Sequence, residues 1–207
     1  MKFLHNISRV EALSDGVFAF AATLLAATLD NGQSDTALNI DTVSFASFFI
    51  SFFILILLWK AHYNFFRRTN YMDNWVIAFN AVFLFSVLYF IFPLKSILYS
   101  IFRQFAVTQD SLSNLFELYG SAIFFIFLSL SIMYYYTYKK DQENLAPIKM
   151  LFYARHFGIF VFIAAISILL SYLKIGLQFG LSGMIYMLLG PICWFHGVWS
   201  RKRYGSF

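Results

Sequence analysis

Six long apolar stretches separated by shorter polar segments dominate the pattern of residues along the chain. A bilayer has a hydrocarbon core about 30 Å thick, and a helix needs roughly 20 apolar residues to cross it. The stretches lack the apolar/polar alternation that marks a membrane β-strand. We therefore predict an all-α integral membrane protein with six spans, at about residues 10–29, 43–58, 75–92, 115–136, 151–173 and 177–199.

The loops between these stretches are short, and no internal repeat is visible, so we expect residues 1–207 to form a single membrane domain. Pro93 is predicted to end the third span, because proline has no backbone N–H. The longest loop, 94–114, carries apolar residues that favour an interfacial helix: Ile97, Leu98, Ile101, Phe102 and Phe105. Three residues in the sixth stretch favour an interruption: Gly183, Gly190 and Pro191.

Composition supports the membrane assignment, because 60% of the residues are apolar and 12% are charged. Ordinary soluble domains carry about 25% charged residues. These values exclude a soluble globular enzyme and a disordered chain, and the single cysteine excludes a disulfide scaffold. Four tyrosines near the end of the fourth span fit an interfacial aromatic belt: Tyr134, Tyr135, Tyr136 and Tyr138.

The positions of Lys and Arg predict the orientation in the cell membrane. Twelve lie on one side of the predicted spans: Lys2, Arg9, Lys60, Arg67, Arg68, Lys139, Lys140, Lys149, Arg155, Arg201, Lys202 and Arg203. Three lie on the other side: Lys95, Arg103 and Lys174. Because the excess belongs on the cytoplasmic side, we expect both termini in the cytoplasm.

The sequence lacks the residue patterns of membrane enzymes and metal sites. Four histidines lie at or beyond the inner ends of the spans, without H-E-x-x-H or His-Cys metal spacing: His5, His62, His156 and His196. There is no G-x-S-x-G elbow, no phosphate-binding glycine loop and no T-V-G-Y-G carbonyl filter. We expect no enzyme activity, catalytic residue, metal, cofactor or nucleic-acid partner, and we interpret Cys193 as a packing residue.

The first span begins with an unusually polar segment, R-V-E-A-L-S-D-G. Glu11 fits a capping box with Ser8, which would only start the helix. Further along, Arg9, Ser14 and Asp15 favour an interhelical network, because polar groups inside a membrane need partners on neighbouring helices. The candidate partners in the next two spans are Trp59, His62 and Asn80. At this border a histidine either titrates near neutral pH or is held by a hydrogen bond, and we favour the hydrogen bond.

Helical spacing places one stripe of residues along the first span. It consists of Gly16, Phe20, Thr23, Ala27 and Asp30, with Leu24 at its flank. The stripe combines an aromatic ring, a hydroxyl, a small residue and an acid at the predicted outer end. Periodicity alone leaves two interpretations open: a packing seam inside a helix bundle, or the lining of a pore.

The polar segment resembles the R-x-x-x-F-S-D-G motif of the bacterial, single-repeat relatives of the endosomal and lysosomal transmembrane potassium channel. The matching residues are Arg9, Leu13, Ser14, Asp15 and Gly16. A second, supporting block consists of Trp59, His62, Asn80 and Pro93. The two blocks cover about the first 95 residues, and the six-span layout extends the resemblance along the chain.

The resemblance implies a homotetramer in which the first helix of each subunit lines a central pore. It places a hydrophobic constriction at Phe20, a potassium-preferring hydroxyl at Thr23 and a further apolar pore position at Ala27. These residues belong to the stripe that periodicity identifies, which favours the pore interpretation, and we count Leu24, at the flank of the stripe, among the expected constriction residues. The implied function is a potassium-permeable, weakly selective cation channel. Its expected partners are potassium and other monovalent cations, the lipid bilayer and copies of itself.

Two departures from the family pattern change what we expect. Leu13 replaces the motif phenylalanine, and Ala27 stands where a larger aliphatic residue is usual. The narrowest point is therefore expected at Phe20, with a wide outer vestibule edged by Asp30. A proton-coupled or proton-permeable transporter stays open as the alternative, although the spans carry few of the buried ionisable groups that transporters use.

Overall fold

The computed structural model describes residues 7–27, 42–103, 108–141, 144 and 146–205. Within that part, six helices are long and apolar enough to cross a membrane: Ile7–Ala27 (α1), Thr42–Phe66 (α2), Asn74–Leu98 of α3 (Asn74–Arg103), Gln109–Lys140 (α4), Pro147–Tyr172 (α5) and Leu181–Tyr204. The chain is thus an all-helical, multi-pass membrane protein. Most of these helices extend beyond the apolar stretches on which the spans were predicted, because polar residues continue the helix outside the hydrocarbon.

The sixth span is built from several short pieces. After a 3-10 turn at Leu177–Phe179 (η1), it comprises Leu181–Met184 (α6), Ile185–Leu188 (η2) and Leu189–Tyr204 (α7). The interruption expected here is a tightening of the helix, because η2 is a 3-10 segment. The turn before the span relies on Gly176, whose φ is +61°. A Cβ at this position would lie 2.9 Å from Leu181 Cδ2.

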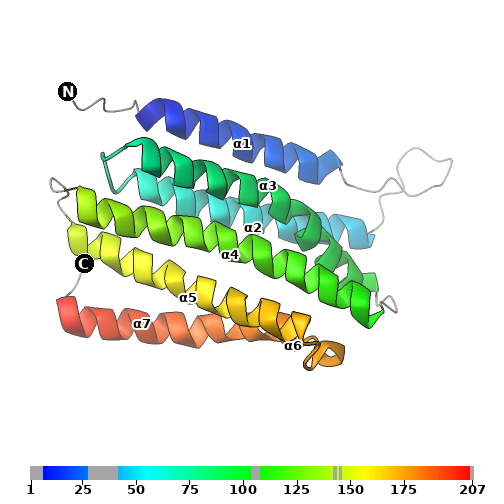
Figure 1. The fold of residues 1–207 in the computed structure, drawn as a ribbon. Helices are drawn as coiled ribbons and strands as arrows, with labels where there is room; N and C mark the ends of the chain where they lie inside the picture. The colour runs from blue at the N-terminus through cyan, green and yellow to red at the C-terminus, as the bar shows by residue number, and fades with distance from the viewer. Residues whose placement is uncertain (1–6, 28–41, 104–107, 142–143, 145, 206–207) are drawn as a thin grey trace.

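The six spans run side by side, and the chain passes up and down the bundle (Figure 1). The start of α1 and the end of α7 therefore lie at the same end (Figure 1). Helix α4 packs against both α3 and α5, while α1 contacts α2 and α3 at one edge and α7 contacts α5 at the other. Hence α1 and α7 occupy opposite edges of the subunit.

The core lies between α2, α3 and α4, where the largest fully buried side chains include Phe65, Phe83, Phe90 and Tyr134. The aromatic belt prediction is wrong for Tyr134, which is fully buried, whereas Tyr135 is half exposed. The ring of Tyr134 is enclosed by Phe65 and Phe157, with centroids 5.0 and 5.6 Å away. Helix periodicity places Tyr134 and Tyr135 on different faces of α4. Only the packing of the other helices decides which of these faces is buried.

Pro93 does not end the third span, because α3 continues through it to Arg103. In lipid there is no water to satisfy backbone groups outside a helix, so continuing the helix around a proline is less costly than leaving it. The expected interfacial helix of segment 94–114 is accordingly an extension of α3 as far as residue 103, and Phe105 lies outside the described residues.

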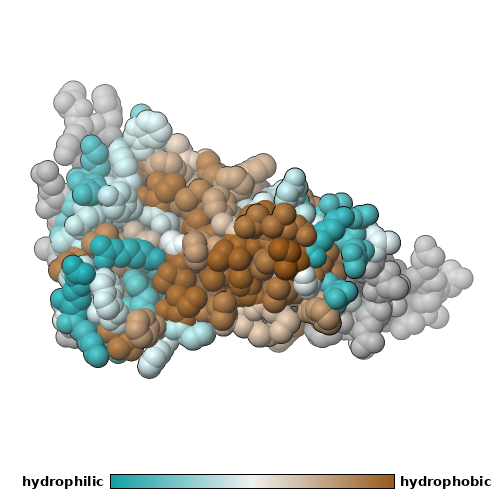
Figure 2. Space-filling model, turned by 60° about the horizontal axis from the view of Figure 1, so that its bottom comes forward, coloured by the Kyte–Doolittle hydropathy of each residue, from teal (hydrophilic) through white to brown (hydrophobic). Residues whose placement is uncertain are grey.

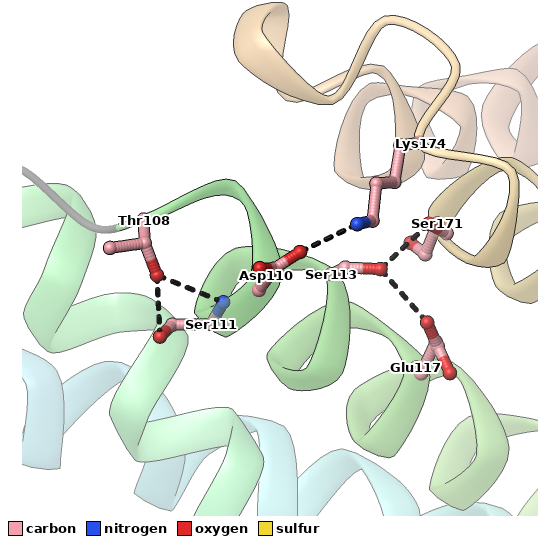
Figure 3. A network of polar contacts seen from close by, with 7 residues as sticks. All are labelled: Thr108, Asp110, Ser111, Ser113, Glu117, Ser171 and Lys174. Atoms are coloured by element: carbon pink, nitrogen blue, oxygen red, sulfur yellow. Dashed lines mark hydrogen bonds and ion pairs between the residues drawn. The ribbon is translucent and has the colours of Figure 1, made fainter.

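Polar contacts join α4 to the end of α5 at one end of the bundle (Figure 3). Thr108 caps α4 by accepting a hydrogen bond from the amide of Ser111. The hydroxyl of Ser113 donates to the carbonyl of Ser171, at 2.7 Å. Lys174, in a left-handed conformation with φ of 55°, donates to Asp110 Oδ1 at 2.5 Å. These contacts fasten the turn that follows α5 onto the first turns of α4.

A second polar cluster anchors the α2–α3 connection at the other end. Asp73 accepts hydrogen bonds from the hydroxyls of Tyr71 and Tyr136, at 3.0 and 2.7 Å, and from the amide of Val76. Partial burial by itself would raise the pKa of Asp73, but these hydrogen bonds outweigh it and hold the pKa below its ordinary value. Burial and the bond to Asp73 raise the pKa of Tyr71. The connection is therefore tied to α4 through a charged acceptor.

The surface has the layering of a membrane protein. Figure 2 shows a hydrophobic band across the middle of the molecule and hydrophilic residues toward its two ends. One end carries basic residues of α4, α5 and α7, including Lys139, Lys149 and Arg201, and the other carries Lys174. This separation agrees with the charge pattern, and the cytoplasmic placement of the termini stays a prediction.

Candidate functional site: the exposed face of α1 and its anchors

Helix α1 has two distinct faces within the subunit. One face is buried against α2 and α3 and consists of Ser14, Phe18, Ala21 and Leu25. The opposite face is exposed and includes Leu13, Gly16, Phe20, Thr23 and Ala27. The stripe found from periodicity is therefore not a packing seam within the subunit. Leu24, at its flank, is half-buried against the core.

The exposed stripe places an aromatic ring one turn before a hydroxyl. The side chain of Phe20 is 55% exposed. The hydroxyl of Thr23 donates to the carbonyl of Ala19 at 3.0 Å. Because its hydrogen is used inside the helix, the oxygen of Thr23 presents lone pairs as an acceptor. Ala27 is the last residue of α1, and Asp30 lies outside the described residues.

The buried face of α1 is held by a chain of hydrogen bonds that crosses three helices. Asn80 Nδ2 on α3 donates to Ser14 Oγ at 3.1 Å, and Ser14 donates to the carbonyl of Val10 at 2.8 Å. This leaves Asn80 Oδ1 to accept from His62 Nε2 on α2, at 2.6 Å. The ring of His62 therefore carries hydrogen on Nε2. All donors point the same way, from α2 through α3 to α1.

Aromatic rings shield this series of hydrogen bonds from surrounding solvent and lipid. His62 is 2% exposed, and its ring stacks on Phe83 with centroids 4.9 Å apart. Phe66 and Phe18 lie at centroid distances of 4.9 and 5.7 Å. Hydrogen bonds are stronger in such a low-dielectric environment, and a missing partner is more costly there. The favoured interpretation of His62, a histidine held by a hydrogen bond, matches its geometry.

Asp15 makes a separate contact with α2. Its Oδ1 accepts a 2.8 Å hydrogen bond from Trp59 Nε1, and the indole stacks on Tyr63 with centroids 5.4 Å apart. A groove of about 270 Å³ runs beside this contact between α1 and α2. Its lining residues are Asp15, Phe18, Ala19, Ala22, Phe52, Leu55, Ile56 and Trp59. The structure thus brings together Ser14, Asp15 and their three expected partners.

The other motif residues stand apart from this network. Arg9 is exposed and makes no hydrogen bond or ion pair with any residue that the structure describes. Leu13 and Gly16 lie on the exposed face with the stripe. Helix α1 already begins at Ile7, so Ser8 stands inside its first turn and not at the N-cap position of a capping box.

In the sequence, Arg68 served only to predict the orientation of the spans through its charge. In the structure it also makes specific contacts with other helices. Its guanidinium donates to the hydroxyls of Tyr134 and Tyr153, at 2.8 and 3.0 Å, and lies 4.0 Å from the centroid of the Tyr153 ring. The sequence offered one indication of these contacts: Arg68 directly follows a span, and other spans carry tyrosines at their inner ends. This contact fastens the α2–α3 unit to α4 and α5.

Comparison with known proteins agrees with this arrangement. Residues 9–91 match the model of a family described as endosomal/lysosomal potassium channel TMEM175. A "Potassium channel" of Marivirga tractuosa is 33% identical over 150 residues, which are 64% of this chain and 60% of the relative. A potassium channel of Streptomyces collinus is 31% identical over 83 residues, or 37% of this chain and 40% of that one. The chain thus spans less than two thirds of either relative.

Solved structures support the same fold. The crystal structure of the potassium channel MtTMEM175 superimposes with a TM-score of 0.74 at 24% identity, covering 97% of this chain and 96% of that one. A homologue of the lysosomal potassium-selective channel TMEM175 from Chamaesiphon minutus gives a TM-score of 0.59 at 21% identity, covering 88% of this chain and 97% of that one. Both sequence relatives are named potassium channels. Over residues 9–91 and in its fold, the chain is thus similar to TMEM175 potassium channels.

Proposed function

We propose that the protein is a potassium-permeable, weakly selective cation channel in which four subunits place α1 around a central pore. The observation that carries this proposal is the exposed face of α1, where Phe20 and Thr23 have no packing role within the subunit. A stripe that only faced lipid would not need a glycine, a hydroxyl group or a small residue at its end. The potassium channels among the similar proteins support the same function.

Closure of the pore is assigned to Phe20. Four aromatic rings around a narrow axis exclude water, and an ion that must shed its hydration shell meets a barrier there. Four Ala27 side chains, about two turns further along the helix, are too small to close the same path. The constriction therefore lies at a single level, with a wider vestibule between it and Asp30.

Selectivity is assigned to Thr23. Its hydroxyl hydrogen is held by Ala19, so four oxygens would face the ion as neutral acceptors. Potassium gives up water more readily than sodium, and a ring of neutral oxygens favours it modestly. Because four hydroxyls replace fewer water ligands than a carbonyl filter does, we expect weak selectivity.

The hydrogen-bond network serves this pore by fixing the position of α1. Ser14 and Asp15 connect α1 to α3 and α2, at the same end of the bundle as the basic residues. The diameter at Phe20 depends on how firmly this end is held. With both termini in the cytoplasm, as the charges predict, the constriction is closer to the cytoplasm than Thr23.

Ion flux from liposomes that carry the purified protein tests the proposal. We expect a potassium gradient to drive more flux than an equal sodium gradient, with protein-free liposomes as the control. Equal flux would keep the pore and remove Thr23 as its selectivity element. Flux that saturates and requires a proton gradient would instead establish a proton-coupled transporter. Light scattering coupled to size-exclusion chromatography tests the tetramer, and a monomer under conditions that give flux would contradict it.

A further inference from the structure

Two arginines from different helices lie against one tyrosine, at the end of the bundle that carries the basic residues. Arg155 on α5 donates a hydrogen bond from Nη1 to the hydroxyl of Tyr204, the last residue of α7, at 3.2 Å. The guanidinium carbon of Arg203 lies 5.7 Å from the centroid of the Tyr204 ring and 5.3 Å from that of Trp199. Two positive charges are therefore held beside the same phenol.

Neither of these charges is neutralised within the described part of the chain, where neither guanidinium forms an ion pair with an acidic side chain. At the same end, Asp73 and Asp141 accept hydrogen bonds from residues of the α2–α3 connection. Like charges repel each other. A pair of arginines held together without an acid is therefore suited to binding an anion.

The depth of Arg155 strengthens the case for an anion. This residue lies more than two turns inside α5, which begins at Pro147. A charged side chain at the border of a membrane extends toward the headgroups or needs a partner of opposite charge. Among the described residues, its only hydrogen bond is to the neutral hydroxyl of Tyr204. A headgroup phosphate would supply the missing negative charge at this depth.

An exposed apolar stripe on α7 leads from Arg203 toward the middle of the bundle. Ile192, Phe195 and Trp199 are 38, 68 and 39% exposed. Their spacing of three and four residues, with Arg203 four residues further on, places all of them on one face of the helix. Acyl chains can cover such a stripe, and tryptophan favours the headgroup level above it. A free phosphate ion would leave the stripe unused.

We propose that Arg155 and Arg203 bind the headgroup phosphate of an anionic phospholipid, whose acyl chains lie along this stripe. Guanidinium groups bind phosphate through paired, charge-assisted hydrogen bonds. The lipid joins α7 to α5 where the sixth span, the least buried of the six, has little other support. The site lies on α5 and α7 and does not depend on the pore proposed above.

Titration of short-chain phosphatidylglycerol into the full-length protein in a non-ionic detergent tests the site. Tryptophan fluorescence supplies the signal, because Trp199 borders the two arginines. We expect saturable binding that weakens as the salt concentration rises. Phosphatidylcholine with the same chains should bind at least ~5-fold more weakly, because its ammonium group brings a further positive charge to the arginines. Inorganic phosphate should not compete at equal concentration, because it lacks the acyl chains. No binding, equal binding of the two lipids, or displacement by inorganic phosphate would overturn the proposal.

Three variants separate this site from general attraction to the basic end. Arg155→Gln and Arg203→Gln should each weaken the binding of phosphatidylglycerol at least ~5-fold, the effect of about 1 kcal/mol per basic residue. Arg203 makes no hydrogen bond to the described residues, so its replacement leaves the contact between Arg155 and Tyr204 in place.

The matched control is Arg67→Gln, which removes an exposed arginine directly after α2, with its guanidinium 5.9 Å from the centroid of the Tyr63 ring. This control should bind phosphatidylglycerol like the wild type. An equal loss of affinity in all three variants, or wild-type affinity in Arg203→Gln, would overturn the assigned site.

Discussion

The indole Nε1 of Trp59 donates a 2.8 Å hydrogen bond to Oδ1 of Asp15, across the boundary between α2 and α1. The acceptor lies one residue from the buried Ser14 and five residues before Phe20, so it secures the base of the exposed stripe. Trp59 is itself held by stacking on Tyr63. Through this contact, α2 helps to hold the orientation of the proposed pore helix.

We expect Asp15→Ala to abolish tetramer assembly or conduction without changing the preference between cations. The variant loses the charge-assisted hydrogen bond from Trp59, and with it a side-chain contact that ties this end of α1 to α2. Trp59→Phe keeps the stacking on Tyr63 and removes the donor, so it should cause a milder defect of the same kind. Size-exclusion chromatography and liposome flux measure both steps. An Asp15→Ala channel with normal conductance would contradict the anchoring role.

Asn80→Ala should destabilise the subunit, because it leaves His62 and Ser14 without their shared partner in a buried site. Each unsatisfied group costs about 1–3 kcal/mol, and for a chain of this size 1 kcal/mol corresponds to roughly 2–4 °C in the melting midpoint. The control is Ser86→Ala on the same helix, whose hydroxyl bonds, among the described residues, only to the carbonyl of Val82. Equal melting midpoints for the two variants would show that the hydrogen bonds from His62 through Asn80 to Ser14 add no stability.

Removing the ring of Phe20 should make the closed channel leak. Phe20→Ala widens the proposed constriction and allows water and ions to pass. Phe162→Ala is the matched control, because Phe162 is 66% exposed but lies on α5, away from α1. Background potassium efflux from liposomes should rise in the first variant only. Unchanged efflux from the Phe20 variant would move the gate elsewhere.

Thr23→Val should lower the preference for potassium over sodium. Valine has nearly the shape of threonine and lacks the acceptor oxygen, so the variant separates chemistry from pore width. Thr23→Ser retains the hydroxyl and should retain most of the preference. Reversal potentials under a potassium–sodium gradient measure the ratio. If valine and serine variants had the wild-type ratio, a different residue would set selectivity.

Protonation of Asp73 should weaken the inner end of the bundle at low pH. Because its pKa is lower in the folded protein, its contribution to stability is complete above about pH 4 and is lost as the pH falls through the folded-state pKa. Asp73→Asn should be less stable than the wild type at neutral pH, with the difference shrinking in acid. Thermal unfolding between about pH 3 and pH 7 measures this. A difference that stays constant with pH would contradict it.

The contribution of the neighbouring Tyr71 to stability should have the opposite pH dependence to that of Asp73. Its pKa is raised in the folded protein, so its contribution is complete below about pH 10 and is lost as the pH rises through the folded-state value. Tyr71→Phe removes one of the donors to Asp73 and should move the acid-induced loss of stability to higher pH. An acid transition identical to that of the wild type would show that Tyr71 does not hold the carboxylate.

The chain's apolar pattern was sufficient to predict six spans and the stripe on α1, because bilayer thickness and the helical repeat are local constraints on a sequence. The motif segment also indicated Trp59, His62 and Asn80 as partners of Ser14 and Asp15. That inference succeeded because a polar group in lipid must find one of the few other polar groups nearby.

Only the tertiary structure decided which faces meet. It turned Ser14 and Phe18 inward and Phe20 outward, and it buried Tyr134 beneath Arg68, which is 66 residues away in the chain. It also carried α3 through Pro93, because lipid offers no hydrogen-bond partners to backbone groups that leave a helix. Which faces meet depends on the packing of residues that lie far apart in sequence. A periodic pattern shows which residues share a face of a helix, but not which helix packs against that face.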